Sequence, residues 1–229
     1  MITNFEKMNL TLIIPAKNEQ ESLPIVLEEL KPYNYKTLVV LHKTDLLTIE
    51  SIKNFNVEII YQENRGYGDA LIKGIRNCKT DLFCIFNADG SFDPKELSQM
   101  IKLLNNNNLD FIFGSRYEKN ASSDDDTLIT LIGNFIFTLI GKIFFKLKIT
   151  DILYTYVLGK TESAKLINLN QKNFSFCVEL PIKAIRNKMK MGSMSCHERK
   201  RIAGEKKVNA FKDGFIILIY MIKLFFKKN

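Results

Sequence analysis

The sequence predicts an α/β protein built on a mostly parallel sheet that is flanked by helices. Short apolar runs rich in β-branched residues recur between residues 10 and 113, and stretches with helical spacing of apolar residues separate them. This alternation is typical of parallel strands joined by crossover helices, so it indicates a doubly wound sheet. The 229 residues fit one such domain, or one domain with a tail, and a hydrophobic content of 46% allows a sizeable core.

The elements of the first half follow from local pattern and from breaker residues. Residues 10–14 form an apolar, β-branched run that ends at Pro15, which predicts a buried strand. Residues 19–30 carry apolar side chains near helical spacing, and Lys31 and Pro32 end that helix. The same reasoning predicts strands at 37–41, 57–61, 82–86 and 110–113, and helices at 45–54, 69–77 and 94–105.

The second half contains a polar stretch and two apolar ones. Residues 118–126 are polar and acidic, which predicts a mobile loop. Residues 128–147 are strongly apolar but marginal for the ~20 residues that a spanning helix needs. They fit either a buried helix at the edge of the core, the default for a soluble α/β protein, or a helix lying on a bilayer. We expect one main domain over residues 1–210. A C-terminal apolar and basic helix at 211–229 would follow, and its broad apolar faces favour a membrane surface.

Charge and cysteine content narrow the functional classes. The formal charge of +8 indicates a phosphate-rich partner, namely a nucleotide, an anionic membrane surface or nucleic acid. No aromatic and basic platform supports nucleic-acid binding, so we expect none. The four cysteines are scattered without a CxxC pair, which argues against a zinc site or a disulfide framework. Residues 1–7 show no apolar core of a signal peptide, so we expect a cytoplasmic protein.

The turn after residues 82–86 is the most informative local feature. The apolar run stops at Asn87, Ala88, Asp89, Gly90 and Ser91, before Pro94 opens a helix. A carboxylate at the C-terminal end of a buried strand lies where α/β proteins bind ligands. Amide and hydroxyl oxygens beside it suit a hard divalent cation that bridges to phosphates. An ordinary strand-to-helix turn with Asp and Ser as helix caps is the alternative.

Motifs along nearly the whole chain, from about residue 10 to about residue 214, resemble the family-2 glycosyltransferases. The nearest group is the polyprenyl-phosphate sugar synthases of the dolichyl-phosphate mannose synthase type. The resemblance implies a Rossmann-like GT-A fold, the nucleotide-diphospho-sugar transferase fold, with amphipathic helices at the C-terminal end. It rests on the order and spacing of short motifs at 14–19, 64–70, 87–90, 114–117 and 199–209.

The resemblance also implies roles for particular residues. Mg²⁺ or Mn²⁺ would be held by Asp89, with Asn87 and Ser91 as further ligands. The nucleotide-sugar donor would be bound by Pro15, Lys17, Glu19, Asn87, Ala88, Asp89, Arg116, Arg201 and Lys207. The catalytic set would be Asp89, Arg116, Arg201 and Glu179. For several of these a plainer interpretation stays open, since Glu19 also suits the first turn of a helix and the basic run also suits a solvated loop.

The chain departs from the family pattern at four places, one of which is Lys17, where the first motif commonly has an aromatic or other residue. The run from Val39 to Asp45 lacks the paired aspartates that the family has here, although Thr44 and Asp45 of the family's Gly-Ser-Thr-Asp sequence survive. Asn87 replaces the first Asp of the Asp-x-Asp motif, which removes one negative charge from the metal site. Lys206 replaces a serine of the late basic motif. These changes leave the donor open and permit weak or lost activity.

The function expected from these observations is metal-dependent, inverting transfer of a sugar to a polyprenyl phosphate. The enzyme would act in cell-envelope glycan or glycolipid synthesis, as a peripheral protein on the inner face of the cell membrane. A saccharide or glycolipid hydroxyl acceptor would need a general base, for which Glu179 and Asp151 are candidates. A degenerate, membrane-associated subunit without turnover is a further alternative. Nucleotidyl transfer is disfavoured because residues 14–19 lack a Gly-rich loop.

Overall fold

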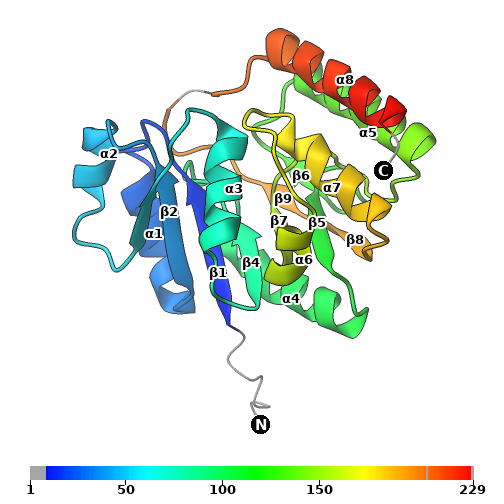
Figure 1. The fold of residues 1–229 in the computed structure, drawn as a ribbon. Coiled ribbons are helices and arrows are strands. Elements are labelled where there is room, and N and C mark those ends of the chain that lie inside the picture. The colour runs from blue at the N-terminus through cyan, green and yellow to red at the C-terminus, as the bar shows by residue number, and fades with distance from the viewer. Residues whose placement is uncertain (1–8, 205, 228–229) are drawn as a thin grey trace.

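The computed structural model describes residues 9–204 and 206–227 and contains a seven-stranded mixed sheet covered by helices on both faces (Figure 1). The strand order is β3-β2-β1-β4-β7-β5-β8. Residues 1–8, Glu205 and residues 228–229 lie outside the described residues. The start of the predicted domain 1–210, the end of the predicted helix 211–229 and one position of the late basic motif therefore lie outside them too.

The predicted strands and helices of the first half are confirmed, with small shifts at their ends. The predicted helix 19–30 begins four residues later, at Leu23, because residues 19–22 form a turn whose Glu19 backbone N–H bonds to Thr48 Oγ1 (3.0 Å). Two short 3₁₀ helices, Lys31–Tyr33 and Pro94–Glu96, extend or precede α-helices. The observed elements are β1 (Leu10–Pro15), α1 (Leu23–Leu30), β2 (Lys36–Leu41), α2 (Leu46–Ser51), β3 (Glu58–Tyr61), α3 (Tyr67–Asn77), β4 (Leu82–Ile85), α4 (Leu97–Asn106) and β5 (Phe111–Ser115).

Burial on both faces explains why these strands are apolar along their whole length. Strand β1 pairs in parallel with β2 on one side and with β4 on the other. Ile13 points to a core formed with α3 and α7, whereas Leu12 and Ile14 point to the opposite core, formed with α1 and α4. Because successive side chains of a strand alternate between faces, a central strand needs an apolar residue at each position.

An antiparallel strand in the second half was not predicted. Strand β7 (Val157–Lys160) lies antiparallel between β4 and β5, and β8 (Met191–Ser195) adds a parallel strand beyond β5. Four residues give too little periodicity to distinguish a buried strand from a turn. A side chain at Gly159 would collide with the ring of Phe111, so the neighbouring strand fixes that position. The other elements here are β6 (Ser122–Ser123), β9 (His197–Glu198), α6 (Thr161–Leu166) and α7 (Phe176–Arg186).

Two long apolar helices, α5 (Leu128–Phe145) and α8 (Ala210–Phe226), pack side by side at one edge of the molecule (Figure 1). Helix α5 buries a narrow stripe that includes Asn134 and Thr138, and α8 buries Ile217 and Met221. Among the helices of the described residues, α5 has the length and composition to cross a membrane, with a mean hydropathy of 2.0 and 22% of the 18 residues buried. Large apolar side chains exposed on the two helices are Leu128, Ile129, Leu131, Ile132, Phe135, Ile136, Leu139, Ile143, Phe144, Phe211, Phe215, Ile219, Ile222, Phe225 and Phe226.

Candidate active site

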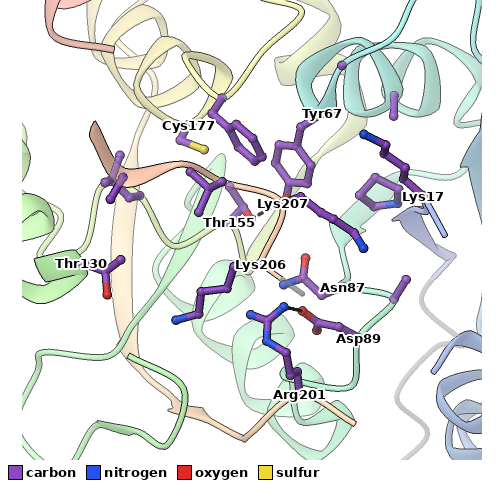
Figure 2. A pocket seen from close by; sticks show the side chains of 18 of the residues that line it. Lys17, Tyr67, Asn87, Asp89, Thr130, Thr155, Cys177, Arg201, Lys206 and Lys207 are labelled. Atoms are coloured by element: carbon purple, nitrogen blue, oxygen red, sulfur yellow. Dashed lines mark hydrogen bonds and ion pairs between the residues drawn. The ribbon is translucent and has the colours of Figure 1, made fainter. Parts of the chain in front are cut away.

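A cavity of about 1120 Å³ lies at the C-terminal ends of β1, β2 and β4 (Figure 2). Parallel strands bring these ends together at one edge of the sheet, where α/β proteins bind ligands. The cavity is polar over the sheet and becomes apolar between α5 and α8. The polar part is lined by Pro15, Lys17, Glu19, His42, Asn87, Ala88, Asp89, Arg201, Lys206 and Lys207. The apolar part, called the apolar arm below, is lined by Ile129, Ile132, Phe137, Phe211, Phe215 and Leu218.

The turn after β4 holds the three predicted metal ligands close together. Asp89 Oδ1 accepts hydrogen bonds from the backbone N–H (3.0 Å) and the hydroxyl (2.7 Å) of Ser91. The Asn87 side-chain amide donates to the same hydroxyl oxygen at 3.2 Å. Ser91 is buried and does not line the cavity, so its hydroxyl orients Asp89. Asp89 Oδ2 is the oxygen that faces Arg201 Nη1, at 3.6 Å.

The donor atoms of this turn fit a divalent cation that is shared with a diphosphate. Within residues 9–204 and 206–227, no group of three or more His, Cys, Asp or Glu side chains could hold a metal ion by itself. Mg²⁺ is commonly bound through one or two carboxylates together with substrate phosphates. Asp89 and the amide oxygen of Asn87 suit that arrangement, in which a bound diphosphate completes the ligand set.

A stretch that we call the basic segment, residues 199–204 and 206–208, packs onto the Asp89 turn. The backbone N–H of Ile202 donates to the Asp89 carbonyl (2.8 Å), and that of Arg199 donates to the Ser91 carbonyl (2.9 Å). Gly90 has a φ of +82°, and a Cβ there would collide with the side chain of Ile202. Glycine is therefore needed both for the left-handed turn and for this close approach.

Three cations of the basic segment face carboxylates of the cavity wall. Arg201 Nη2 lies 2.6 Å from Asp125 Oδ2, and Lys206 Nζ lies 3.4 Å from the same oxygen. Lys207 Nζ lies 3.6 Å from Glu19 Oε1. Burial raises the pKa of Glu19, although a hydrogen bond from Ser22 and the charge of Lys207 partly oppose this. The predicted donor residues Glu19, Asp89, Arg201 and Lys207 therefore lie around one cavity.

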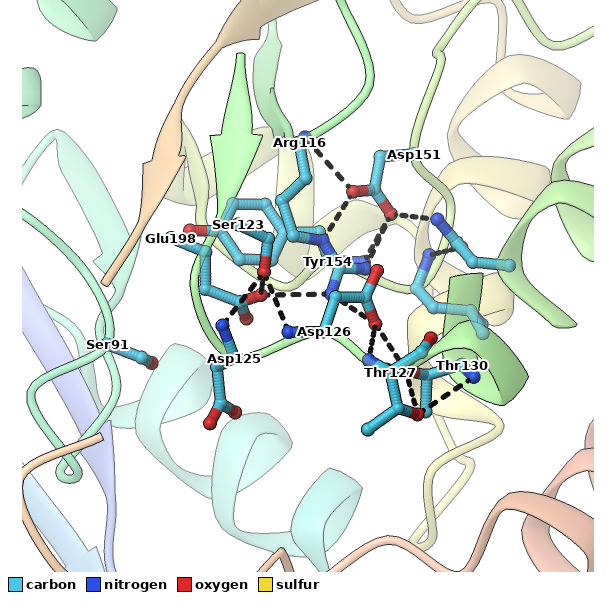
Figure 3. Close-up of polar contacts among 12 residues, drawn as sticks. Ser91, Arg116, Ser123, Asp125, Asp126, Thr127, Thr130, Asp151, Tyr154 and Glu198 are labelled. Carbon is cyan, nitrogen blue, oxygen red and sulfur yellow. Dashed lines mark hydrogen bonds and ion pairs between the residues drawn. The ribbon is translucent and has the colours of Figure 1, made fainter. Parts of the chain in front are cut away.

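Arg116 lies at the wall of the same cavity but within a cluster of carboxylates (Figure 3). Its guanidinium binds Asp151 through two contacts, Nε to Oδ2 (2.8 Å) and Nη2 to Oδ1 (3.1 Å). A third contact joins Nη1 to Glu198 Oε2 at 3.3 Å, and the Tyr154 ring centre lies 4.7 Å from Cζ. Burial alone would lower the pKa of Arg116, but Asp151 and Glu198 outweigh it and raise that pKa well above its ordinary value.

Glu179 lies away from the cavity, in the first turn of α7. Its side chain is fully buried and accepts hydrogen bonds from Gln171 N (2.8 Å), Lys183 Nζ (2.6 Å) and the Tyr220 hydroxyl (3.0 Å). These contacts join α7 to α8 and to the loop before α7. The sequence suggested Glu179 as a general base, but the structure keeps its carboxylate out of the cavity and occupies both oxygens. Asp151, the other candidate base, is fully buried and bound to Arg116.

Three cavity residues were not singled out as site residues from the sequence. Asp125 contacts both Arg201 and Lys206, although the acidic stretch 118–126 gave no sign of this pairing. His42 lies at the end of β2, and its Nδ1 accepts from the backbone N–H of Thr44 (3.3 Å). Since a backbone N–H can only donate, the proton of a neutral His42 ring is on Nε2. The departure from the family pattern after residue 41 is the sequence feature that could have pointed to His42 as a site residue.

Comparison with known proteins was made by sequence and by structure. A sequence model of the family described as "Glycosyl transferase family 2" matches residues 11–167. An uncharacterised glycosyltransferase of Mycobacterium tuberculosis strain H37Rv is 23% identical over 209 residues, which cover 91% of this chain and 94% of that protein. A UDP-N-acetylglucosamine–dolichyl-phosphate N-acetylglucosaminyltransferase of Methanococcus voltae is 25% identical over 211 residues, covering 80% of this chain and 82% of that protein.

A solved structure shares the fold at low sequence identity. It is the glucosyl-3-phosphoglycerate synthase of M. tuberculosis in complex with Mn²⁺, uridine diphosphate and phosphoglyceric acid. The TM-score is 0.73 at 12% identity, and the match covers 97% of this chain and 80% of that protein.

Proposed function

The chain belongs to glycosyl transferase family 2 and has the GT-A fold, and on that premise we propose that it transfers a sugar from a nucleoside-diphosphate donor to a polyprenyl phosphate. In this reaction a phosphate oxygen of the acceptor attacks the anomeric carbon of the sugar. The bond from that carbon to the donor diphosphate breaks, and the configuration inverts. The site is proposed to act at the inner surface of the cell membrane.

The observation that carries this proposal is the continuity of the cavity. One end holds Asp89, Arg201 and Lys207, and the apolar arm runs from there between α5 and α8. A polyprenyl phosphate joins a strongly charged head to a long apolar chain, so it matches both ends at once. The dolichyl-phosphate transferase of M. voltae supports the same acceptor class.

The donor is proposed to lie over β1, β2 and β4. Pro15, Lys17 and Glu19 line the cavity beside the end of β1, and His42 lies at the end of β2. The base and ribose would occupy this side, which is remote from the apolar arm. His42 Nε2–H would then donate to a carbonyl of the base, where paired aspartates of other family members accept. In this arrangement the donor diphosphate would lie next to Asn87, Ala88 and Asp89.

Charge stabilisation is the main chemical task of the site. A departing nucleoside diphosphate gains negative charge, and Arg201 and Lys207 are positioned beside Asp89 to neutralise it. Asp89 and Asn87 would hold Mg²⁺ or Mn²⁺, which supplies further positive charge on the diphosphate when it is bound. A phosphate acceptor is already ionised and needs no general base. The engagement of Glu179 and Asp151 in buried contacts is consistent with that chemistry.

The exposed faces of α5 and α8 support membrane association. These two helices carry most of the large apolar side chains that are exposed among residues 9–204 and 206–227. Lys146 and Lys223 at the C-terminal end of the helix pair, and Lys212 near the start of α8, suit the anionic headgroups of the inner leaflet. The buried polar residues Asn134 and Thr138 keep one side of α5 against protein. An interfacial position is therefore proposed for the helix pair.

The test is lipid-dependent release of nucleoside diphosphate. UDP-, GDP- and CDP-sugars would be supplied with Mg²⁺ or Mn²⁺ and vesicles containing undecaprenyl phosphate. Asp89→Ala should abolish release, whereas Asp124→Ala, at an exposed carboxylate outside the cavity, should retain it. Release that ignores the lipid would instead indicate a hydroxyl acceptor or hydrolysis. Failure of every donor both to bind and to react would overturn the proposal in favour of a degenerate subunit.

A further inference from the structure

The carboxylate of Asp125 is held between two cations inside the cavity. Arg201 contacts it through two nitrogens, Nη2 to Oδ2 (2.6 Å) and Nε to Oδ1 (3.3 Å). Lys206 Nζ lies 3.4 Å from Oδ2 and also donates to the Asp125 backbone carbonyl. Figure 2 shows Arg201 and Lys206 beside Asp89, and all four residues line the cavity. We call this arrangement the Asp125 bridge.

The neighbours of Asp125 show that its contact with these cations is particular to its position. Asp124 is exposed and faces His197 Nε2 at 3.1 Å. Asp126 accepts hydrogen bonds from the Tyr117 and Thr130 hydroxyls at the start of α5. Asp125 turns toward Arg201 and Lys206 instead. Of the three consecutive aspartates, only Asp125 therefore pairs with Arg201 and Lys206.

The chemistry of the two cations suits a phosphate better than a carboxylate. A guanidinium fork binds two oxygens of either group, and an ammonium adds a point charge. A carboxylate offers one charge and two oxygens, whereas a phosphate monoester offers about 1.5 to 2 charges and three oxygens. A phosphate on Arg201 and Lys206 would bring more negative charge to the two cations than the single charge of Asp125, while Asp89 faces Arg201 from the other side at 3.6 Å. Lys206, which replaces the expected serine, supplies the second cation.

The Asp125 bridge is also built so that it can open. Asp125 lies between β6 and α5, and both cations lie between β9 and α8, so neither side belongs to a helix or a strand. The Arg201 and Lys206 side chains remain 20% and 30% exposed. The two cations lower the pKa of Asp125 although burial opposes them, so its carboxylate is ionised and occupies the site at neutral pH.

We propose that Arg201 and Lys206 form a binding site for a phosphate monoester, and that the carboxylate of Asp125 occupies this site until the phosphate displaces it. The inference rests on the proposed function, in which the phosphate is the head of the lipid acceptor. The donor diphosphate would bind at Asp89 and Lys207, on the side of Arg201 that Nη1 faces, whereas Nε and Nη2 of Arg201 face Asp125. Acceptor binding would then open the contact between the acidic stretch and the basic segment.

The experiment is a calorimetric titration of the full chain with inorganic phosphate, which requires no turnover. Asp125→Asn keeps the shape but removes the competing charge, so phosphate should bind about tenfold more tightly, a common size for coupling between two ligands. Asp124→Asn is the matched control, because it removes the same charge from the adjacent exposed position and should leave the dissociation constant unchanged. Lys206→Met should weaken phosphate binding about tenfold. Circular dichroism would verify that each variant is folded.

Two further arms identify the source of the phosphate. Vesicles containing undecaprenyl phosphate should bind Asp125→Asn more tightly than the unmodified chain, and vesicles containing phosphatidylglycerol, a phosphodiester, should show no such gain. Binding of UDP should change little. Equal phosphate affinity with and without Asp125, or an equal gain for Asp124→Asn, would overturn the inference, as would a gain confined to UDP. If phosphate binds as expected but no donor sugar is transferred, the phosphate site stands and the proposed function fails.

Discussion

Arg116 and Arg201 received the same predicted role from the sequence, yet their surroundings differ. Each guanidinium makes a two-nitrogen contact with one aspartate, Asp151 for Arg116 and Asp125 for Arg201. The Arg116 side chain is 11% exposed and that of Asp151 is fully buried. The Arg201 side chain is 20% exposed, and its partner lies on a connecting segment. The burial and the location of the carboxylate therefore decide whether an arginine can exchange it for a phosphate.

The difference arises from what each carboxylate holds together. Asp151 also accepts from the Asn134 side chain (2.6 Å) and the Tyr154 backbone N–H (3.1 Å), so it joins α5 to the segment before β7. Releasing Asp151 would leave a buried charge without a partner, which is expensive. Releasing Asp125 exposes its carboxylate to water in the cavity. We therefore expect Arg116 to act mainly by holding its carboxylate partners in place and Arg201 to be available to ligands.

The largest expected effect is a loss of stability when the buried carboxylate of Asp151 is removed. Asp151→Asn leaves Arg116 without its main partner and should lower the free energy of unfolding by about 3–5 kcal/mol. Urea denaturation followed by circular dichroism measures the change. Asp125→Asn is the matched variant and should cost less, because Asp125 is half-buried and joins two connecting segments, whereas Asp151 is fully buried. Similar losses for the two variants would show that the clusters do not differ as described.

The next largest expected effect is a loss of catalysis when Arg201 is replaced. Arg201→Gln should lower kcat/KM for sugar transfer about 100-fold, the usual effect of losing one donor to a charged transition state. The free energy of unfolding should change little, because Arg201 holds no element of the core. Steady-state kinetics with the identified donor gives the first quantity, and urea denaturation gives the second. Destabilisation without a kinetic defect would reverse the two assigned roles.

Replacing Glu179 tests whether this carboxylate has a structural or a catalytic role. Glu179→Gln keeps the size but removes the charge that faces Lys183, so the free energy of unfolding should fall by about 1–3 kcal/mol. The kcat/KM of the folded variant should stay within about twofold, since the residue lies outside the cavity. The measurement pairs chemical denaturation with kinetics at a temperature where the variant is folded. A large kinetic loss at full stability would restore Glu179 as a base.

The smallest expected effect is a difference in the pH at which the carboxylates of the two clusters take up a proton. Burial raises the pKa of Glu198 beside Arg116, although Arg116 itself opposes the shift, whereas the pKa of Asp125 is lowered by Arg201 and Lys206 against its burial. Carboxyl carbon shifts in NMR should therefore show Glu198 taking up a proton above pH 4.5 and Asp125 only below pH 3.8, their ordinary values. The stability that the raised pKa of Glu198 contributes is complete below pH 4.5 and is lost as pH rises through its folded pKa. The contribution of the lowered pKa of Asp125 is present above pH 3.8 and is lost as pH falls through its folded pKa. The opposite titration order would contradict the comparison.

The sequence by itself determined the α/β class, most elements up to β5, and the placement of Asp89 at the end of β4. These features depend on local spacing and on breakers such as Pro15, which act between near neighbours. The antiparallel β7 was missed, because its position depends on pairing with β4 and β5. The roles predicted for Glu179 and Arg116 took no account of their buried partners, which only the fold brings to them.

The tertiary structure alone decided which charges meet in the cavity. Asp125 and Arg201 are 76 positions apart, and Arg116 and Asp151 are 35 apart. Nothing in the local pattern distinguishes Asp125 from Asp124 or Asp126. The direction of each carboxylate follows from the hydrogen bonds that packing allows, and its energy follows from how much water packing removes. Sequence therefore fixed where a site could form, and folding decided which of its charges a ligand can displace.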